Sequence, residues 1–222
     1  MKAYKFLSLK YGLDTIKNQR LKVATLHELN DPFELYSFGL SNKVHRELFR
    51  NWKRAFTLST GLLCYSKSWH NPLLWSHYGD RHKGVVLEFE IQNKYVMDVL
   101  YESERLVLDL DKELAKDKMD IKIVHRLMAT KFSQWKYEDE IRMMIKLSEC
   151  KRINNLFFYD IGNEIKLTGI IQGPLCKLDK NSIAEIIKKN SKIELIKSRL
   201  AFTTFSVVQN KSYKKLLISG KA

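Results

Sequence analysis

The run from Phe132 to Ile145 constrains this chain most, because it places three consecutive acids between aromatic residues and an apolar segment. If the run is extended, its side chains alternate between two faces, and Glu138, Glu140 and Arg142 share one of them. Two carboxylates close to each other and to a buried strand have separated pKa values, which suits acid/base chemistry or stabilisation of an oxocarbenium ion. The alternative interpretation is a surface strand whose charges only form ion pairs.

Length and cysteine usage indicate one reduced, cytoplasmic domain. The 222 residues are 45% hydrophobic, which is enough for a core. Apolar runs stay well short of the roughly 18 residues that span a membrane, and the N-terminus lacks the pattern of a signal peptide. The three cysteines, Cys64, Cys150 and Cys176, show no CxxC spacing, so we expect neither disulfides nor a structural zinc site. We expect no contact with a membrane.

The net charge of +14 is unevenly distributed along the chain. Residues 121–222 carry 20 Lys and Arg against 9 Asp and Glu. Such a basic half would attract a polyanion such as nucleic acid. Lys far outnumbers Arg, however, whereas sequence-specific readers of nucleic acid rely on Arg, so a generally Lys-rich composition explains the charge equally well.

Hydrophobic periodicity predicts an α+β domain spanning residues 1–222, since strands dominate and helices do not alternate regularly with them. Strands are expected over residues 4–9, 21–26, 60–66, 84–91, 135–147, 156–159, 165–172, 193–197 and 202–208, with one or two more within 94–108. Helices are expected over residues 12–18, 43–56, 73–78, 109–132 and 179–189. In the second helix, Val44, Leu48, Trp52 and Phe56 form the apolar stripe that we assign to the core.

Several common site signatures are missing from the sequence, including GxGxxG, GxxxxGK[ST], GxSxG and HExxH. His70, His77 and His82 have a spacing that suggests a metal, but no Cys or clustered Asp completes the ligand set, so no metal site is predicted. Cys64 lies on a predicted buried strand and is interpreted as a core thiol, not a nucleophile. The Asn-Asp-Pro-Phe-Glu turn would place Asp31 or Glu34 at the rim of a site.

Three polar and aromatic blocks remain, and together they describe a cleft with a carboxylate at its end. The first block is Tyr4-Lys5 on the first strand. The second is the strand end at Ser66 with the aromatic patch of Trp75 and Tyr78. The third is the acidic strand ending at Arg142.

These blocks resemble a family of bacterial domains of unknown function. Its members carry a Tyr-Lys-aromatic start, an Asn-Asp-Pro-Phe-Glu turn, a Ser- and Trp-rich patch ending in Gly, a Trp-x-Tyr-Glu-x-Glu-x-Arg strand and a closing strand and turn. The matching segments here are Tyr4-Lys5-Phe6, residues 30–34, residues 66–84, residues 135–142 and residues 170–174. The resemblance spans most of the chain.

More distantly, the order of the blocks is similar to that of ADP-ribosyltransferases. That resemblance implies a split two-sheet core with inserted helices, and NAD bound as a substrate in a bent conformation. It makes Glu140, or else Glu138, the catalytic acid that binds the nicotinamide ribose and stabilises the oxocarbenium ion.

The same resemblance assigns the remaining site residues. Tyr4 and Ser66 would line the NAD pocket, and Trp75 or Tyr78 would stack on nicotinamide. Lys5 and Arg142 would neutralise the pyrophosphate or orient a glutamate. The sequence departs from the pattern in lacking a plain Ser-Thr-Ser strand, and the first-strand residue is either Tyr4 or Lys5.

We therefore expect an enzyme that moves ADP-ribose from NAD to a macromolecule, or hydrolyses NAD, as bacterial toxins or phage-defence effectors do. Its surface charge favours nucleic acid as acceptor, and a neutralising or regulatory protein would be a further partner. Two alternatives stay open. One is a non-enzymatic module that binds nucleic acid or a protein partner. The other is a metal-dependent nuclease built on Asp31, Glu138 and Glu140.

Overall fold

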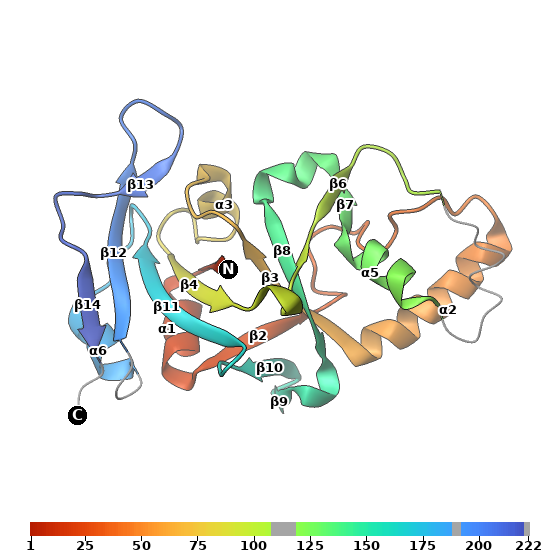
Figure 1. Ribbon diagram of the computed structural model, residues 1–222, viewed down its shortest axis with the longest axis horizontal. Coiled ribbons are helices and arrows are strands. Elements are labelled where there is room, and N and C mark those ends of the chain that lie inside the picture. The colour runs from red at the N-terminus through yellow and green to blue at the C-terminus, as the bar shows by residue number, and fades with distance from the viewer. Residues whose placement is uncertain (108–118, 188–191, 220–222) are drawn as a thin grey trace.

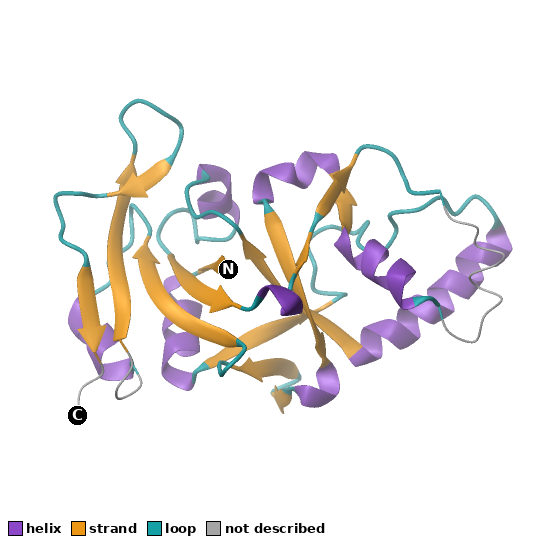
Figure 2. Cartoon of the chain, in the orientation of Figure 1, coloured by secondary structure: helices purple, strands orange, loops and turns teal. Residues whose placement is uncertain are grey.

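The computed structural model describes residues 1–107, 119–187 and 192–219, which form a mixed fold of helices and strands (Figures 1 and 2). The helices are α1 (Leu9–Asn18), α2 (Lys43–Ser59), α3 (Pro72–His77), α5 (Ile121–Ala129) and α6 (Lys180–Ile186), with 3-10 helices η1 (Asn93–Tyr95), η2 (Ser133–Glu138) and η3 (Leu147–Glu149). The strands are β1 (Lys2–Leu7), β2 (Arg20–Thr25), β3 (Thr60–Ser66), β4 (Val85–Ile91), β5 (Met97–Asp98), β6 (Leu100–Glu102), β7 (Thr130–Phe132), β8 (Glu140–Lys146), β9 (Lys151–Ile153), β10 (Leu156–Asp160), β11 (Ile165–Gln172), β12 (Lys192–Leu200), β13 (Val207–Gln209) and β14 (Leu216–Ser219).

Within the described residues, twelve strands form one large mixed sheet and two form a small parallel pair. The large sheet runs β13-β12-β11-β4-β1-β3-β2-β10-β9, with β8 added to β3, β5 to β8 and β14 to β12. The β11–β12 pair is parallel, and the other pairs of the large sheet are antiparallel. Strands β6 and β7 make the small pair. The expected mixture of helices and strands is thus confirmed.

The large sheet divides at β3. One edge of β3 pairs with β8 over its whole length, from Thr60 opposite Lys146 to Ser66 opposite Glu140. The other edge is shared, since β2 pairs with the start of β3 and β1 pairs with its last residue, Ser66, through Tyr4. Strands β1 and β2 therefore separate from each other along β3, and the space between them is left to side chains.

Apolar side chains pack in three clusters around this sheet. The largest cluster lies between the sheet and helices α1 and α6, and it includes Ile16, Leu87 and Ile183. A second lies under α2 and α5, and a third surrounds Trp75. No helix among the described residues has the length and apolar character needed to cross a membrane.

Helix α2 forms where expected, but its apolar stripe was predicted wrongly. Phe49 is the fully buried residue of this helix, and it stacks on Trp52, whereas Val44 and Leu48 are exposed. Trp52 and Phe56, the other two members of the predicted stripe, are partly buried and stack on each other. Phe49 is one position after Leu48, about 100° around the helix, so the buried face is rotated from the stripe that spacing suggests, and packing partners decide which face that is.

Three segments differ from the predicted elements. Residues 133–138 form a 3-10 helix instead of a strand, and Asp139 has a positive φ of 44°, so β8 begins only at Glu140. The helix predicted over 109–132 gives way to β7 at Thr130, and its residues 109–118 lie outside the described residues. The strand predicted over 202–208 is a strand only from Val207, because residues 201–206 form a turn.

Candidate functional site

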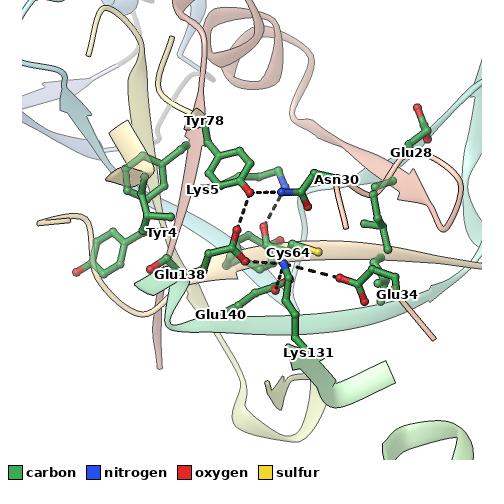
Figure 3. Close-up of a pocket in the computed structure, with 17 residues that line it drawn as sticks. Tyr4, Lys5, Glu28, Asn30, Glu34, Cys64, Tyr78, Lys131, Glu138 and Glu140 are labelled. Atoms are coloured by element: carbon green, nitrogen blue, oxygen red, sulfur yellow. Dashed lines mark hydrogen bonds and ion pairs between the residues drawn. The ribbon is translucent and has the colours of Figure 1, made fainter. Parts of the chain in front are cut away.

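A cavity of about 230 Å³ opens where β1 and β2 separate along β3 (Figure 3). Its walls come from β1, β3, the loop after β2, the segment after α3 and the start of β8. Tyr4, Lys5, Ser66, Tyr78, Glu138 and Glu140, six of the residues singled out in the sequence, all line it. These six residues are brought together from four segments of chain that lie far apart in sequence.

Strand register explains how three of these residues meet. Tyr4 of β1 pairs with Ser66 of β3, and Ser66 pairs with Glu140 of β8. Directly paired residues of neighbouring strands point to the same face of a sheet, so the three side chains form one row across the dividing sheet. The hydroxyl of Ser66 donates to the carbonyl of Ser68 at 2.9 Å and turns the chain away from the strand end.

Arg142 holds two carboxylates that line the cavity, those of Glu34 and Glu140. The side chain is 1% exposed, and its Nε and Nη2 donate to the two oxygens of Glu140 at 2.9 and 3.0 Å. Nη1 and Nη2 also donate to the two oxygens of Glu34 at 2.8 and 2.6 Å, and Nη1 donates to the carbonyl of Met128. Arg142 does not line the cavity, and of the two roles expected for it, neutralising a pyrophosphate or orienting a glutamate, its contacts fit the second, toward Glu140.

Lys131 is a central residue that the sequence did not reveal. Its ammonium lies 2.6 Å from Glu138, 3.3 Å from Glu140 and 3.7 Å from Glu34. Figure 3 draws these three contacts as dashed lines. Seven residues separate it from Glu138, and no periodic pattern in the sequence joins the two. Glu34 had a signal, since it ends the Asn-Asp-Pro-Phe-Glu turn.

Tyr78 holds the second carboxylate. Its hydroxyl donates to Glu138 at 2.6 Å, and it accepts from the side-chain amide of Asn30. Asn71 begins α3 as its N-cap and donates to the carbonyl of Tyr137, which ties α3 to the turn that carries Glu138. The Tyr78–Glu138 pair is thereby fixed at the cavity wall.

The two carboxylates have opposite pKa shifts. Burial disfavours ionisation of Glu140, but the contacts with Arg142 and Lys131 outweigh it and lower the pKa to about 2. Burial raises the pKa of Glu138, with Lys131 and Tyr78 opposing the rise. Glu140 is therefore an anion at every physiological pH, and Glu138 is the carboxylate closer to exchanging a proton.

Lys5 and Cys64 also line the cavity, and both lie close enough to Glu140 to feel its charge. The ammonium of Lys5 donates to the carbonyl of Cys64 at 3.0 Å, and burial lowers its pKa. Burial, reinforced by the charge of Glu140, raises the pKa of the Cys64 thiol. Cys64 stays protonated and is unsuited to act as a nucleophile, although it lines the cavity.

Trp75 does not contribute to the cavity, which corrects the expectation that it stacks on a ligand. The side chain is 0% exposed, its Nε1 donates to the carbonyl of Trp69 at 2.6 Å, and its ring packs edge-on against Phe6. Aromatic side chains serve both as stacking surfaces and as core residues, and the Trp75 ring is fully enclosed in the core. Tyr78 is the aromatic side chain of this patch that reaches the cavity.

The residues proposed for a metal-dependent nuclease do not meet. The carboxylate of Asp31 accepts from the backbone of Phe33 and lines a neighbouring cavity, away from Glu138 and Glu140. No group of three His, Cys, Asp or Glu within the described parts of the chain is arranged to hold a metal ion. Lys131 occupies the centre of the three converging carboxylates of Glu34, Glu138 and Glu140.

Replacing Glu140 by glutamine is expected to reduce the acid sensitivity of folding. Its folded-state pKa lies below the unfolded value of about 4.3, so the ionised side chain stabilises the fold at higher pH, and this contribution disappears as the pH falls from about 5 toward 2. A depression of this size corresponds to about 3 kcal/mol. Urea unfolding over this pH range would show a steeper loss in wild type than in Glu140→Gln, and equal slopes would contradict the assignment.

Comparison with known proteins adds a family match over part of the chain. No curated protein and no solved structure gives a significant match. Residues 74–143 match a family model described as a protein of unknown function, DUF2971. The matched segment runs from α3 into β8 and contains Tyr78, Lys131, Glu138, Glu140 and most of the ionic network. Over these residues the chain is similar to a domain of unknown function.

Proposed function

We propose that the cavity binds the nicotinamide-ribose end of NAD and that the protein transfers ADP-ribose to a macromolecule or to water. The observation that carries the proposal is the permanently ionised Glu140, held by two hydrogen bonds from Arg142 beside a second, titratable carboxylate in one cavity. Departure of nicotinamide leaves positive charge on the ribose, and a fixed anion in a water-poor site stabilises such charge. The division of the large sheet at β3 supports an ADP-ribosyltransferase-like core.

The reaction divides between the two carboxylates. The bond between the ribose C1′ and the nicotinamide nitrogen breaks, and its electron pair leaves with nicotinamide. Glu140 stabilises the oxocarbenium ion that remains. A hydroxyl of the acceptor, or water, attacks C1′ and gives its proton to Glu138, whose raised pKa suits a general base.

The size of the cavity limits what it can enclose. Its volume of about 230 Å³ lies below the roughly 300–1,000 Å³ of typical ligand pockets, so it would enclose one base and one ribose of NAD and leave the adenylate half outside. Tyr78 and Tyr4 line this space and are the aromatic residues proposed to contact nicotinamide. Lys5 lies on the same wall, but its ammonium is directed at the carbonyl of Cys64, so a role toward the pyrophosphate would require it to turn.

The test uses the purified protein with NAD carrying a label on the adenine. Nicotinamide release from NAD alone indicates a glycohydrolase, and label transfer to added protein, RNA or DNA indicates a transferase. The activity is expected to persist with a chelator, unlike that of a metal-dependent nuclease. Absence of both nicotinamide release and label transfer would overturn the proposal. We also propose that the protein acts in the cytoplasm as a toxin or phage-defence effector and that a protein partner restrains it.

Replacing Tyr78 by phenylalanine is expected to shift the acidic limb of the pH–rate profile to higher pH. The Tyr78 hydroxyl donates to Glu138 and lowers its pKa, so its loss raises that pKa further. The general base must be ionised, and the mutant would therefore lose activity at a higher pH than wild type. Tyr11→Phe, at an exposed position on α1, is the control. An unchanged or lowered limb in Tyr78→Phe would contradict Glu138 as the base.

A further inference from the structure

An exposed aromatic turn lies beside the cavity. Residues 201–206 join β12 to β13, and the projecting loop above β13 is visible in Figure 1. Phe202 and Phe205 of this turn are 88% and 101% exposed, so neither ring contributes to a core. The guanidinium of Arg199 lies 4.1 Å from the centre of the Phe202 ring. Because burial of these two phenylalanines does not stabilise the fold, we look for a binding role for them.

This turn is fixed to the loop that borders the candidate site. The backbone of Val207 donates to the carbonyl of His70, and Nδ1 of His70 lies 2.7 Å from the carbonyl of Val207. A groove of about 710 Å³ runs between the turn and this loop. Ser66 and Leu74 line both the groove and the cavity, so the two hollows are neighbours.

The walls of the groove carry polar groups among apolar ones, and the segment that contains the turn is basic. Its walls carry the hydroxyls of Ser68 and Ser206 and the side chains of His70, Asn71 and Tyr137, together with the carboxylate of Asp139. Residues 197–219 contain five basic residues, Lys197, Arg199, Lys211, Lys214 and Lys215, and no Asp or Glu. Lys215 is paired with Glu194, and the other four have no carboxylate partner among the contacts of the described residues.

We propose that this turn and groove bind a single-stranded nucleic acid, with a base stacked on Phe205. Free aromatic faces beside basic side chains are what sequence-tolerant binders of single strands use, because every base has a ring face and every nucleotide a phosphate. A duplex is disfavoured, since its bases offer no free face to Phe205.

The same single-stranded nucleic acid would serve as the acceptor of ADP-ribose. The groove leads to the wall that carries Ser66, next to Glu140 in the sheet, so a strand lying in it would reach the proposed reaction centre. This second step rests on the proposed function, whereas the binding does not. The two are separable by experiment.

Fluorescence anisotropy of labelled single-stranded RNA and DNA oligonucleotides tests the binding. Replacing Phe202 and Phe205 together by serine is expected to weaken binding roughly tenfold or more, since stacking contributes about 1–3 kcal/mol per base. Affinity should fall steeply with salt, and Arg199→Gln should reduce that slope. The matched control is Tyr11→Ser, which removes another exposed aromatic ring with a lysine, Lys10, over it.

Three outcomes would overturn the inference. The first is a Phe202→Ser/Phe205→Ser double variant that binds oligonucleotides as wild type does. The second is a wild type that binds none, and the third is a dependence on these phenylalanines for binding anionic lipid vesicles and not oligonucleotides. Oligonucleotide binding is measured without NAD, so a failure of the NAD reaction would leave the binding result standing.

Discussion

Replacing Arg142 by methionine is expected to lower the free energy of unfolding by about 3–5 kcal/mol, because the change leaves two buried carboxylates without their main partner. Arg142 directs four hydrogen bonds at Glu34 and Glu140 and a fifth at the carbonyl of Met128. Methionine fills much of the same space but donates nothing. Lys131 still neutralises one charge, but at 3.7 Å it interacts only weakly with Glu34.

Urea unfolding at neutral pH measures this loss, with Arg54→Met, an exposed position on α2, as the control. Arg142→Lys keeps the charge but loses the two-pronged geometry, so its stability should lie between those of wild type and Arg142→Met. The Glu34→Gln/Arg142→Met double variant should recover part of the loss, because one uncompensated charge is removed with its partner. A cost below about 1 kcal/mol for Arg142→Met would show that the buried network does not stabilise the fold.

Replacing Glu138 by glutamine is expected to lower the steady-state rate of NAD turnover about 10²–10⁴-fold, the usual contribution of a positioned general base. Glutamine has nearly the same shape and still accepts from Tyr78, so the fold should be retained. Its amide cannot take the proton of the attacking hydroxyl. The loss should therefore appear in kcat and not in the KM for NAD.

Chromatography of released nicotinamide measures the effect, and urea unfolding confirms that the variant is folded. Glu149→Gln removes an exposed carboxylate on η3 and serves as the matched control, with a rate expected to equal that of wild type. A wild-type rate in Glu138→Gln would remove this residue from the chemistry. If both variants lost activity, the loss would come from removing a negative charge anywhere on the protein, and not from the position of Glu138 in the cavity.

The local pattern of the chain predicted most strands and the identity of the paired acids. β3 and β11 were predicted with their bounds, and β4 nearly so, because apolar and β-branched residues dominate these runs of seven or eight positions. The acidic run was misjudged as a continuous strand. Asp139 adopts a left-handed conformation that ends η2, and this turn still brings Glu138 and Glu140 onto the same ammonium group.

Other parts of the site had no local signal. The partner of Arg142 is Glu34, which is 108 residues away in sequence, and spacing cannot predict a contact of that range. Trp75 and Tyr78 look alike in the sequence, and only the packing of Phe6 and Trp69 encloses one while the other reaches the cavity. Phe202 and Phe205 fit a strand pattern, but they lie in the turn between β12 and β13.

The sequence by itself determined which residues carry charge and which segments become strands, because these depend on side-chain chemistry and on periodicity over a few residues. Only the tertiary structure decided that Glu140 is an anion with its pKa lowered to about 2, while the pKa of Glu138 is raised. The physical reason is that these shifts arise from burial and from charges brought within a few ångströms. Both exist only after β1, β3 and β8 have paired and enclosed Lys131 and Arg142.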